Sequence, residues 1–367
     1  MTTLLAFLFA LTVLIAVHEY GHYRMAVACK VPVLVFSIGF GRALYRWRSK
    51  NPREGQNTEF VISALPLGGY VQMLDSREAA VAIDQLPLAF DQRSLKVRAA
   101  IVAAGPLANL VLAVVLFSAV AWWGHPKILP IIGRVEVGAA ADLAGLQKGD
   151  LILKVDSEEV RDAQHLRAFI RGDLGDQNTS HDAEKTSVWE IDRQGQRLSL
   201  AVKPQLTLIP GQPDSSPVRR IGAVVGVPSE TEWVSASFWQ AWVQGYGQVV
   251  QITLMTGQLI GQMITGDASS KHLSGPLTIA EQAGQSAQRG LPAYLTFLGL
   301  ISVSLGLLNL LPLPMLDGGH LMYYLWESLT GKPVSLAWQR GLQKVGLALL
   351  IFIMALAFFN DLTRLFN

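Results

Sequence analysis

The residues best suited to chemistry form one short motif, His18-Glu19-Tyr20-Gly21-His22, which reads H-E-x-x-H. On a helix, the four-residue step from His18 to His22 places both imidazoles on one face, one turn apart. Two imidazoles in this arrangement can bind one metal ion. Glu19 would then lie beside the ion, where a carboxylate can take a proton from bound water. The motif therefore predicts a hydrolytic metal site.

The setting of the motif strengthens this prediction. The run from Leu4 to Val17 contains a single polar residue, Thr12. Ionisable groups at the end of an apolar helix of membrane length are costly, and they indicate function. Three other interpretations are a chance motif, a hydrogen-bonded histidine pair in a core, and a secretory signal peptide. A signal peptide has a basic first region, whereas the first 17 residues contain no Lys or Arg.

Composition indicates an integral membrane protein with soluble parts. Half of the 367 residues are hydrophobic, 16% are charged, and the mean hydropathy is +0.32. The single cysteine, Cys29, excludes an internal disulfide. There is no basic patch interleaved with aromatic residues, so we expect no nucleic-acid partner.

Charge is distributed unevenly along the chain and predicts its topology. The segment 24–98 has 11 basic and 6 acidic residues, the segment 125–290 has 15 and 18, and the segment 318–344 has 3 and 1. Basic loops tend to remain in the cytoplasm. The first and third segments should therefore lie inside, and the second outside.

Apolar segments predict four transmembrane helices, at 1–28, 97–124, 291–320 and 336–360. The second ends in Trp122-Trp123, as at a membrane interface. It also contains Gly105-Pro106 and Asn109, which are tolerable if they face protein. The uncharged stretch 233–266 has glutamines at helical intervals, and this pattern favours an amphipathic helix at the interface or against the bundle over a fifth span.

The segment 29–96 carries strand signals and should form a small membrane-associated β region on the cytoplasmic side. Its feature of interest is Gly39-Phe40-Gly41. One interpretation is an ordinary hairpin. The other is a strand edge close to the metal, which could pair with the unwound backbone of a substrate.

The segment 126–205 has the character of a soluble α+β domain. A strand, a turn of small residues and a short helix are followed by Lys148-Gly149-Asp150-Leu151-Ile152, which leads into another strand. This pattern resembles a PDZ domain of the kind associated with bacterial proteases, and such domains bind extended peptides by strand addition. The stretch 172–186 is polar and irregular. The segment 206–290 should contain a linker and amphipathic interfacial helices.

A catalytic zinc site takes three protein ligands and leaves a fourth position for water. Asp317 is the preferred third ligand, because it ends an apolar span broken by Pro312 and Pro314. Irregular backbone at that depth is tolerated where it lines a cavity. His320 is the rival, and Gly318-Gly319 could let the chain turn it inward.

Several motifs together resemble the site-2 protease family (M50 type) of intramembrane zinc metalloproteases. They occur in the family's order over almost the whole chain: His18 to His22, Phe36 to Gly41, Leu67 to Val71, Ser274-Gly275-Pro276, and Asn309 to Gly319. The resemblance implies that His18, His22 and Asp317 bind Zn²⁺ and that Glu19 is the catalytic base. It also implies that Asn309 helps to hold substrate, and Gly39, Phe40 and Gly41 are further candidates for that role. Well-known relatives carry two PDZ domains, whereas this sequence shows one.

The expected fold is therefore an α-helical polytopic membrane protein of four transmembrane helices, with the small β region and one inserted periplasmic PDZ domain. The resemblance implies a bacterial inner membrane protein with its active site near the cytoplasm. Its substrates would be single-span membrane proteins, such as an anti-sigma factor or remnant signal peptides. Alternatives are a membrane PDZ module with a structural metal, and a metal transporter. Glu19 discriminates, because neither alternative needs a base beside the metal.

Overall fold

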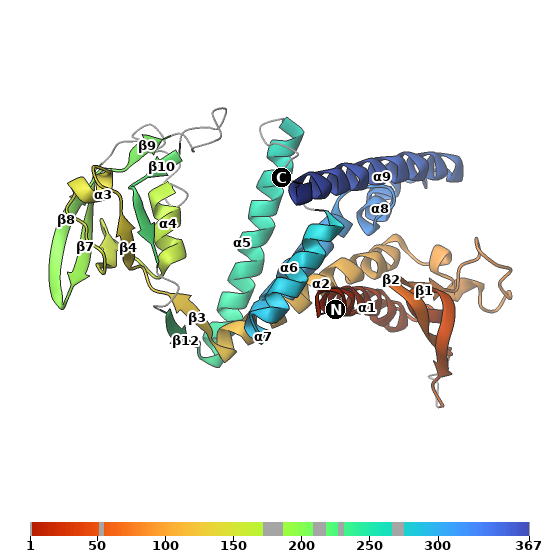
Figure 1. The fold of residues 1–367 in the computed structure, drawn as a ribbon. Helices are drawn as coiled ribbons and strands as arrows, with labels where there is room; N and C mark the ends of the chain where they lie inside the picture. The colour runs from red at the N-terminus through yellow and green to blue at the C-terminus, as the bar shows by residue number, and fades with distance from the viewer. Residues whose placement is uncertain are drawn as a thin grey trace. The chain divides into compact units, whose positions relative to one another are not determined.

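The computed structural model describes residues 2–50, 55–171, 186–207, 218–226, 231–265 and 275–366. It divides into two compact units (Figure 1). The first comprises Met1–Trp123 and Ala236–Asn367, and the second comprises Gly124–Ser235. The predicted polar stretch 172–186 lies outside the described residues except for Thr186, as does most of the predicted linker after residue 207.

The first unit is mainly helical, because its sequence is dominated by long uncharged runs. Four of its helices are long and apolar enough to cross a membrane, as predicted. Helix α5 is not among these candidates within the described part of the chain. The helices are α1 (Thr2–Ala28), α2 (Leu95–Trp123), α5 (Phe238–Thr265), α6 (Pro276–Gln288), α7 (Leu291–Leu310), α8 (Asp317–Thr330) and α9 (Leu336–Phe366); the four candidates are α1, α2, α7 and the Ala337–Asp361 part of α9.

Helix α2 lies at the centre of this unit, between α1 and α7 (Figure 1). The hydroxyl of Ser302 in α7 donates a 2.7 Å hydrogen bond to the carbonyl of Asn109 in α2. Val249 of α5 packs in one cluster with Ala113 and Phe117 of α2. Because α2 is covered by its neighbours, Gly105, Pro106 and Asn109 are all buried in protein. These three residues therefore face protein, which is the condition for their presence in a transmembrane helix.

Helices α6 and α9 are joined by a buried carboxylate. Asp361, near the end of α9, accepts hydrogen bonds from the backbone N–H groups of Gly275, Leu277 and Thr278 at 3.0 to 3.2 Å, and from the Thr278 hydroxyl at 2.5 Å. The first N–H groups of a helix have no partner within the helix. Asp361 therefore caps α6 from a segment more than 80 residues away in sequence.

The β region consists of β1 (Val33–Arg48) and β2 (Glu59–Met73), with short 3₁₀ turns at Leu86–Leu88 and Phe90–Gln92. The inner segment Val33–Ile38 is registered both with Gly69–Met73 and with Glu59–Ile62. It is therefore not an edge. Helix α1 contacts β2 more extensively than β1.

The second unit is an α+β fold with its own core around Trp189, Ile152, Ile191 and Leu166. A four-stranded sheet has the order β6-β5-β7-β8, and α4 covers part of the core. Its elements are β3 (His125–Ile128), β4 (Ile132–Val135), α3 (Ala140–Leu143), β5 (Leu151–Val155), β6 (Glu158–Glu159), α4 (Ala163–Arg171), β7 (Ser187–Arg193), β8 (Gln196–Val202), β9 (Gln205–Thr207), β10 (Val218–Arg220), β11 (Ala223–Val225) and β12 (Thr231–Val234).

The predicted end of this domain at residue 205 is too early. Strand β11 pairs with β4 and β12 pairs with β3, so the compact unit continues to Ser235. These strands contain three or four residues each, and they lie among Pro, Gly and Ser residues. Such short strands show no readable alternation, and their pairing depends on partners about 90 to 110 residues earlier in the chain.

Candidate metal centre

The two histidines of the motif face the same way from α1. His18 and His22 are both buried, with 9% of each residue exposed. Their rings meet edge to face, with centroids 4.8 Å apart, and their Nε2 atoms lie 3.2 Å apart. The helical spacing therefore produces the expected pair of adjacent nitrogen atoms.

Asp317 joins this pair from the other end of the chain. The predicted span 291–320 is not one helix: α7 ends at Leu310, and α8 begins at Asp317. Pro312 and Pro314 lie in the break, where a proline cannot donate a backbone hydrogen bond. Gly319 allows the first turn of α8 to pack on this break, because a Cβ atom there would lie 2.7 Å from Cα of Pro314. The break places Asp317 Oδ2 3.1 Å from Nε2 of His18 and 3.4 Å from Nε2 of His22.

The three ligand atoms form a triangle with sides of 3.1, 3.2 and 3.4 Å. Around a tetrahedral zinc ion with bonds of about 2.0 Å, ligand atoms are about 3.3 Å apart. Among the described residues, His18, His22 and Asp317 form the group of potential ligands that could hold a metal ion. The donor set and its dimensions therefore fit zinc, with the fourth position left for water.

Helix α2 supports both imidazoles, and the sequence analysis missed this role. Nδ1 of His22 donates to the carbonyl of Ile101 at 2.8 Å, which leaves the Nε2 lone pair for a metal. The side-chain amide of Asn109 lies 3.3 Å from Nδ1 of His18. Gly105 lies between Ile101 and Asn109 in the sequence of α2 and packs directly against the ring of His22. Residues 101, 105 and 109 are spaced by about one helical turn, so they lie on one face of α2. The polar residue Asn109 on this apolar helix was the sequence feature that could have indicated the supporting role.

Glu19 lies beside the triangle and against the β region. Its carboxylate interacts electrostatically with both imidazoles and with Asp317. A Cβ atom at Gly69 of β2 would come within 2.8 Å of the Glu19 side chain. The neighbouring Tyr70 stacks on Phe40, with ring centroids 6.2 Å apart, and both residues are more than 40% exposed. An exposed aromatic pair, Phe40 and Tyr70, therefore lies next to Gly69, the residue of β2 that is close to the Glu19 side chain.

The other three predicted substrate-binding residues are Gly39, Gly41 and Asn309. Gly39 and Gly41, at φ +92° and +85°, bend β1 where it leaves its inner segment. Asn309 donates its side-chain N–H to the carbonyl of Leu305, one turn earlier in α7, at 2.9 Å. The structure does not bring Asn309 into the ligand triangle.

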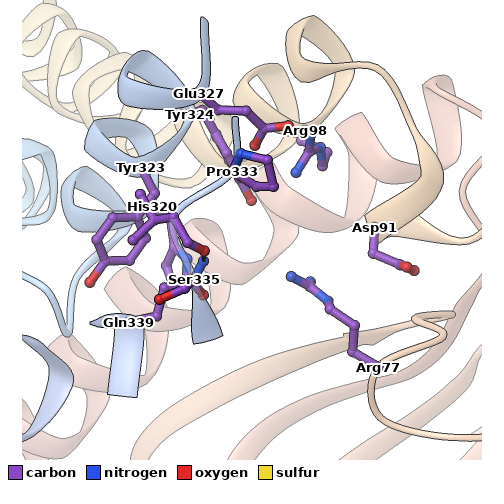
Figure 2. A pocket seen from close by; sticks show the side chains of 11 residues that line it. Arg77, Asp91, Arg98, His320, Tyr323, Tyr324, Glu327, Pro333, Ser335 and Gln339 are labelled. Carbon is purple, nitrogen blue, oxygen red and sulfur yellow. Dashed lines mark hydrogen bonds and ion pairs between the residues drawn. The ribbon is translucent and has the colours of Figure 1, made fainter. Parts of the chain in front are cut away.

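His320, the rival ligand, does not join the triangle. It lies one turn after Asp317 and lines a separate cavity of about 380 Å³ (Figure 2). Arg98 and Glu327 also line that cavity and form a 2.7 Å ion pair. Figure 2 also shows Arg77 extending into the cavity; its hydrogen bonds to Asp75 raise the pKa of the Arg77 guanidinium.

Comparison with known proteins identifies the family to which this arrangement belongs. The sequence profile of Peptidase family M50 matches residues 6–353. The chain belongs to peptidase family M50. It is therefore a membrane metalloprotease of the site-2 type, and its cofactor is zinc.

Individual M50 relatives match along their whole length. The Regulator of sigma-E protease RseP of Salmonella typhimurium is 33% identical over 458 residues, covering 99% of this chain and 98% of the relative. Protease RseP of Yersinia pestis is 34% identical over 450 residues, covering 99% of each. A Neisseria meningitidis protein, provisionally named as a zinc metalloprotease, is 34% identical over 455 residues, covering all of both chains. Since this chain has 367 residues, at least 88 of those 455 aligned positions fall opposite gaps in it.

Proposed function

We propose that His18, His22 and Asp317 hold the zinc ion, and that Glu19 acts as general base in hydrolysing a peptide bond of a transmembrane segment. The observation that carries this proposal is the triangle of three ligand atoms at the spacing that tetrahedral zinc requires. Glu19 borders the triangle without being part of it, which suits a base rather than a ligand.

Bound zinc would supply a water of lowered pKa and would polarise the scissile carbonyl. Glu19 would accept the proton of the water that attacks the scissile carbonyl carbon. The protonated Glu19 would then donate that proton to the leaving amine nitrogen as the C–N bond breaks. Gly69 leaves the room that the Glu19 side chain occupies, because a Cβ atom at Gly69 would lie 2.8 Å from Cγ of Glu19.

The hydrogen bonds behind the imidazoles determine which nitrogens can bind metal. Nδ1 of His22 donates its proton in a hydrogen bond to the carbonyl of Ile101. For His18 to offer Nε2 in the same way, its Nδ1 must carry a proton and donate it to Asn109. A half-turn of the Asn109 amide places Oδ1 in that position, and Oδ1 otherwise has no hydrogen-bond partner.

A helical substrate must unwind before it can be cleaved, because its carbonyls are occupied within the helix. We propose that Gly39, Phe40 and Gly41 and the amide of Asn309 supply replacement contacts to the unwound backbone. The exposed stack of Phe40 on Tyr70, next to Gly69, supports a substrate path along this part of the β region.

The proposed substrates are single-span membrane proteins, such as an anti-sigma factor or a remnant signal peptide. The names of the Salmonella and Yersinia relatives support this class, since they refer to regulation of sigma-E or to the same protease. We place the protein in the bacterial inner membrane, with residues 124–235 in the periplasm and the metal centre near the cytoplasm. The excess of basic residues in 24–98 and of acidic residues in 125–290 supports this orientation.

We also propose that residues 124–235 form a PDZ domain that reads substrates or partners. The total of at least 88 gapped positions in this chain equals the length of one small domain, in keeping with one PDZ domain here and two in better-known relatives.

Replacing the base tests this function. Glu19→Gln should retain about one zinc per chain, measured by metal analysis of purified protein, and should abolish cleavage of a tagged single-span substrate. His18→Ala should lose both zinc and cleavage. Normal cleavage by Glu19→Gln would contradict the protease mechanism, and zinc-dependent ion flux through liposomes would favour a transporter instead.

A further inference from the structure

The position of α8 decides where the third metal ligand lies, because Asp317 is the first residue of this helix. The preceding helix, α7, ends at Leu310, and Pro312 and Pro314 in the break cannot donate backbone hydrogen bonds. Helix α8 contacts α2 more extensively than it contacts α7. Packing on α2, rather than continuity with α7, therefore holds α8 in place.

One ion pair joins the two helices at the far end of α8 from Asp317. Nη2 of Arg98 in α2 donates to Oε1 of Glu327 in α8 at 2.7 Å. Figure 2 shows these two side chains extending toward each other. Their side chains are only 13% and 19% exposed, so water and salt screen this pair less than they screen a pair at the surface. The pair is therefore a stronger link than most exposed ion pairs.

Two further contacts fix the guanidinium of Arg98. Its Nε donates to the carbonyl of Arg93 at 3.1 Å, and its Cζ lies over the ring of Tyr324, 5.1 Å from the centroid. Tyr324 and Glu327 are three residues apart on α8 and so lie on one face. A planar guanidinium can stack on a ring and bind a carboxylate at once, which an ammonium group does less well. The link between α2 and α8 therefore has a defined geometry.

The face of α2 that carries Arg98 is also the face that supports the imidazoles. Ile101 and Asn109 follow Arg98 by three and eleven residues, so all three lie on one side of the helix. The Ile101 carbonyl accepts from His22, and the Asn109 amide lies against His18. Helix α2 thus contacts the elements that bring all three ligands together.

A small movement of α8 is enough to disturb the metal site. Side chains reach about 5–6 Å from a helix axis, so a rotation of roughly 5° moves such an atom by about 0.5 Å. Functional groups of a metal site must be held within about 0.5 Å of their working positions. Glu327 lies ten residues after Asp317, about 15 Å along the helix, where a fixed contact opposes both rotation and tilting about the break.

We propose that Arg98 is a positioning residue for the metal centre: by binding Glu327 and Tyr324, it holds α8 so that Asp317 meets the imidazoles. The inference rests on the proposed function, because it takes Asp317 as the third ligand. The two can fail separately. Normal zinc affinity in Asp317→Ala would contradict the ligand assignment, whereas loss of affinity in Asp317→Ala but not in Arg98→Gln would overturn only the role of Arg98.

The test measures the zinc affinity of the full-length protein in detergent, at low temperature, by competition with a chelator. Arg98→Gln should raise the dissociation constant about tenfold or more, the range found for residues that orient metal ligands, and Arg98→Lys should have a smaller effect. Arg98→Glu places two carboxylates together and should have the largest effect. Adding Glu327→Arg to Arg98→Glu restores opposite charges and should recover most of the loss. Arg98→Gln carries the test if Arg98→Glu does not fold.

Cobalt(II) in place of zinc supplies a readout that a role in folding stability alone would not change. Its visible absorption depends on coordination geometry, so Arg98→Gln should alter the spectrum of the folded, metal-bound protein. Arg77→Gln is the matched control, because Arg77 lines the same cavity but pairs with Asp75 in its own loop. Wild-type affinity and spectrum in Arg98→Gln, no recovery on adding Glu327→Arg, or an equal effect of Arg77→Gln would overturn the inference.

Discussion

The amide of Asn109 stands directly behind the imidazole of His18, with Nδ2 3.3 Å from Nδ1 of the ring. Asn109 is fully buried in α2, and its Oδ1 atom has no hydrogen-bond partner. A metal-binding histidine usually donates its second ring N–H to such a group, which orients the ring and fixes its tautomer. Asn109 is thus placed to orient His18 in the proposed metal site.

Replacing Asn109 by Ala should weaken zinc binding by about 10- to 100-fold. The reason is that Nδ1 of His18 would lose its partner and the ring its orientation. Zinc affinity, measured by competition with a chelator, checks this directly. Ser118→Ala is a suitable control because Ser118 is another buried polar residue of α2 without a hydrogen-bond partner. An unchanged affinity in Asn109→Ala would show that α2 does not support His18.

Adding a methyl group at Gly105 should eliminate the metal site. A Cβ atom there would overlap the ring of His22, so Gly105→Ala must displace that imidazole from the triangle. We expect loss of zinc and, with it, of cleavage. Gly257→Ala, a helical glycine of α5 with open space around it, should keep both. Full zinc occupancy in Gly105→Ala would contradict the close packing of α2 on His22.

Adding a methyl group at Gly69 should have a different effect. The new Cβ would lie 2.8 Å from Cγ of Glu19 and from the carbonyl oxygen of Ser37. Gly69→Ala should therefore displace the base and lower the cleavage rate by about 100-fold or more, the range attributed to general acid–base catalysis. Zinc should stay bound, because Gly69 does not touch the ligands. Metal analysis beside a single-turnover assay checks this, and parallel loss of zinc would mean that Gly69 acts on the metal site itself.

The link between α9 and α6 should matter for stability rather than for chemistry. Asp361→Ala removes the acceptor for the N–H groups of Gly275, Leu277 and Thr278. Losing a helix cap costs about 1–2 kcal/mol, so the thermal midpoint in detergent should fall. Zinc content at low temperature should be normal. Glu281→Gln, an exposed change in α6, is the control; a midpoint equal to that of the control would show that the cap contributes nothing.

Asp91 should make the first unit sensitive to acid. Burial would raise its pKa, but hydrogen bonds from the hydroxyl and N–H of Ser76 outweigh burial and lower the pKa below the ordinary 3.8. A carboxylate with a lowered pKa stabilises the fold above its unfolded pKa, and this stabilisation is lost as pH falls through the folded pKa. The wild type should thus unfold at a higher temperature than Asp91→Asn above about pH 5.

The same difference should shrink as the pH drops below 3.8, the ordinary pKa of an aspartate. Because Asp91 is partly solvated, we expect its carboxylate to add no more than about 1 kcal/mol to the free energy of unfolding at neutral pH. Asp84→Asn, an exposed change in the same segment, should give a smaller and flatter difference. If the difference in unfolding temperature between wild type and Asp91→Asn grew on acidification, the pKa of Asp91 would not be lowered as inferred.

The sequence by itself determined the features that depend on local spacing. The four-residue step between His18 and His22 needs only a helix to bring the rings together, and long uncharged runs are sufficient to predict four membrane-length helices. The strands before and after Lys148-Gly149-Asp150 also follow from local alternation. These signals survive in any tertiary arrangement, because helix period and hydrophobicity are properties of neighbouring residues.

Only the tertiary structure decided which distant groups meet. Asp317 and His320 are one turn apart and both could bind a metal by residue type, and the break between α7 and α8 turns Asp317 to the imidazoles and His320 into another cavity. Asn109 and Gly69 reach His18 and Glu19 through packing of α2 and β2 on α1, and β11 completes the second unit by pairing with a strand about 90 residues earlier. Such contacts depend on how whole elements pack, and no local period in the sequence records that packing.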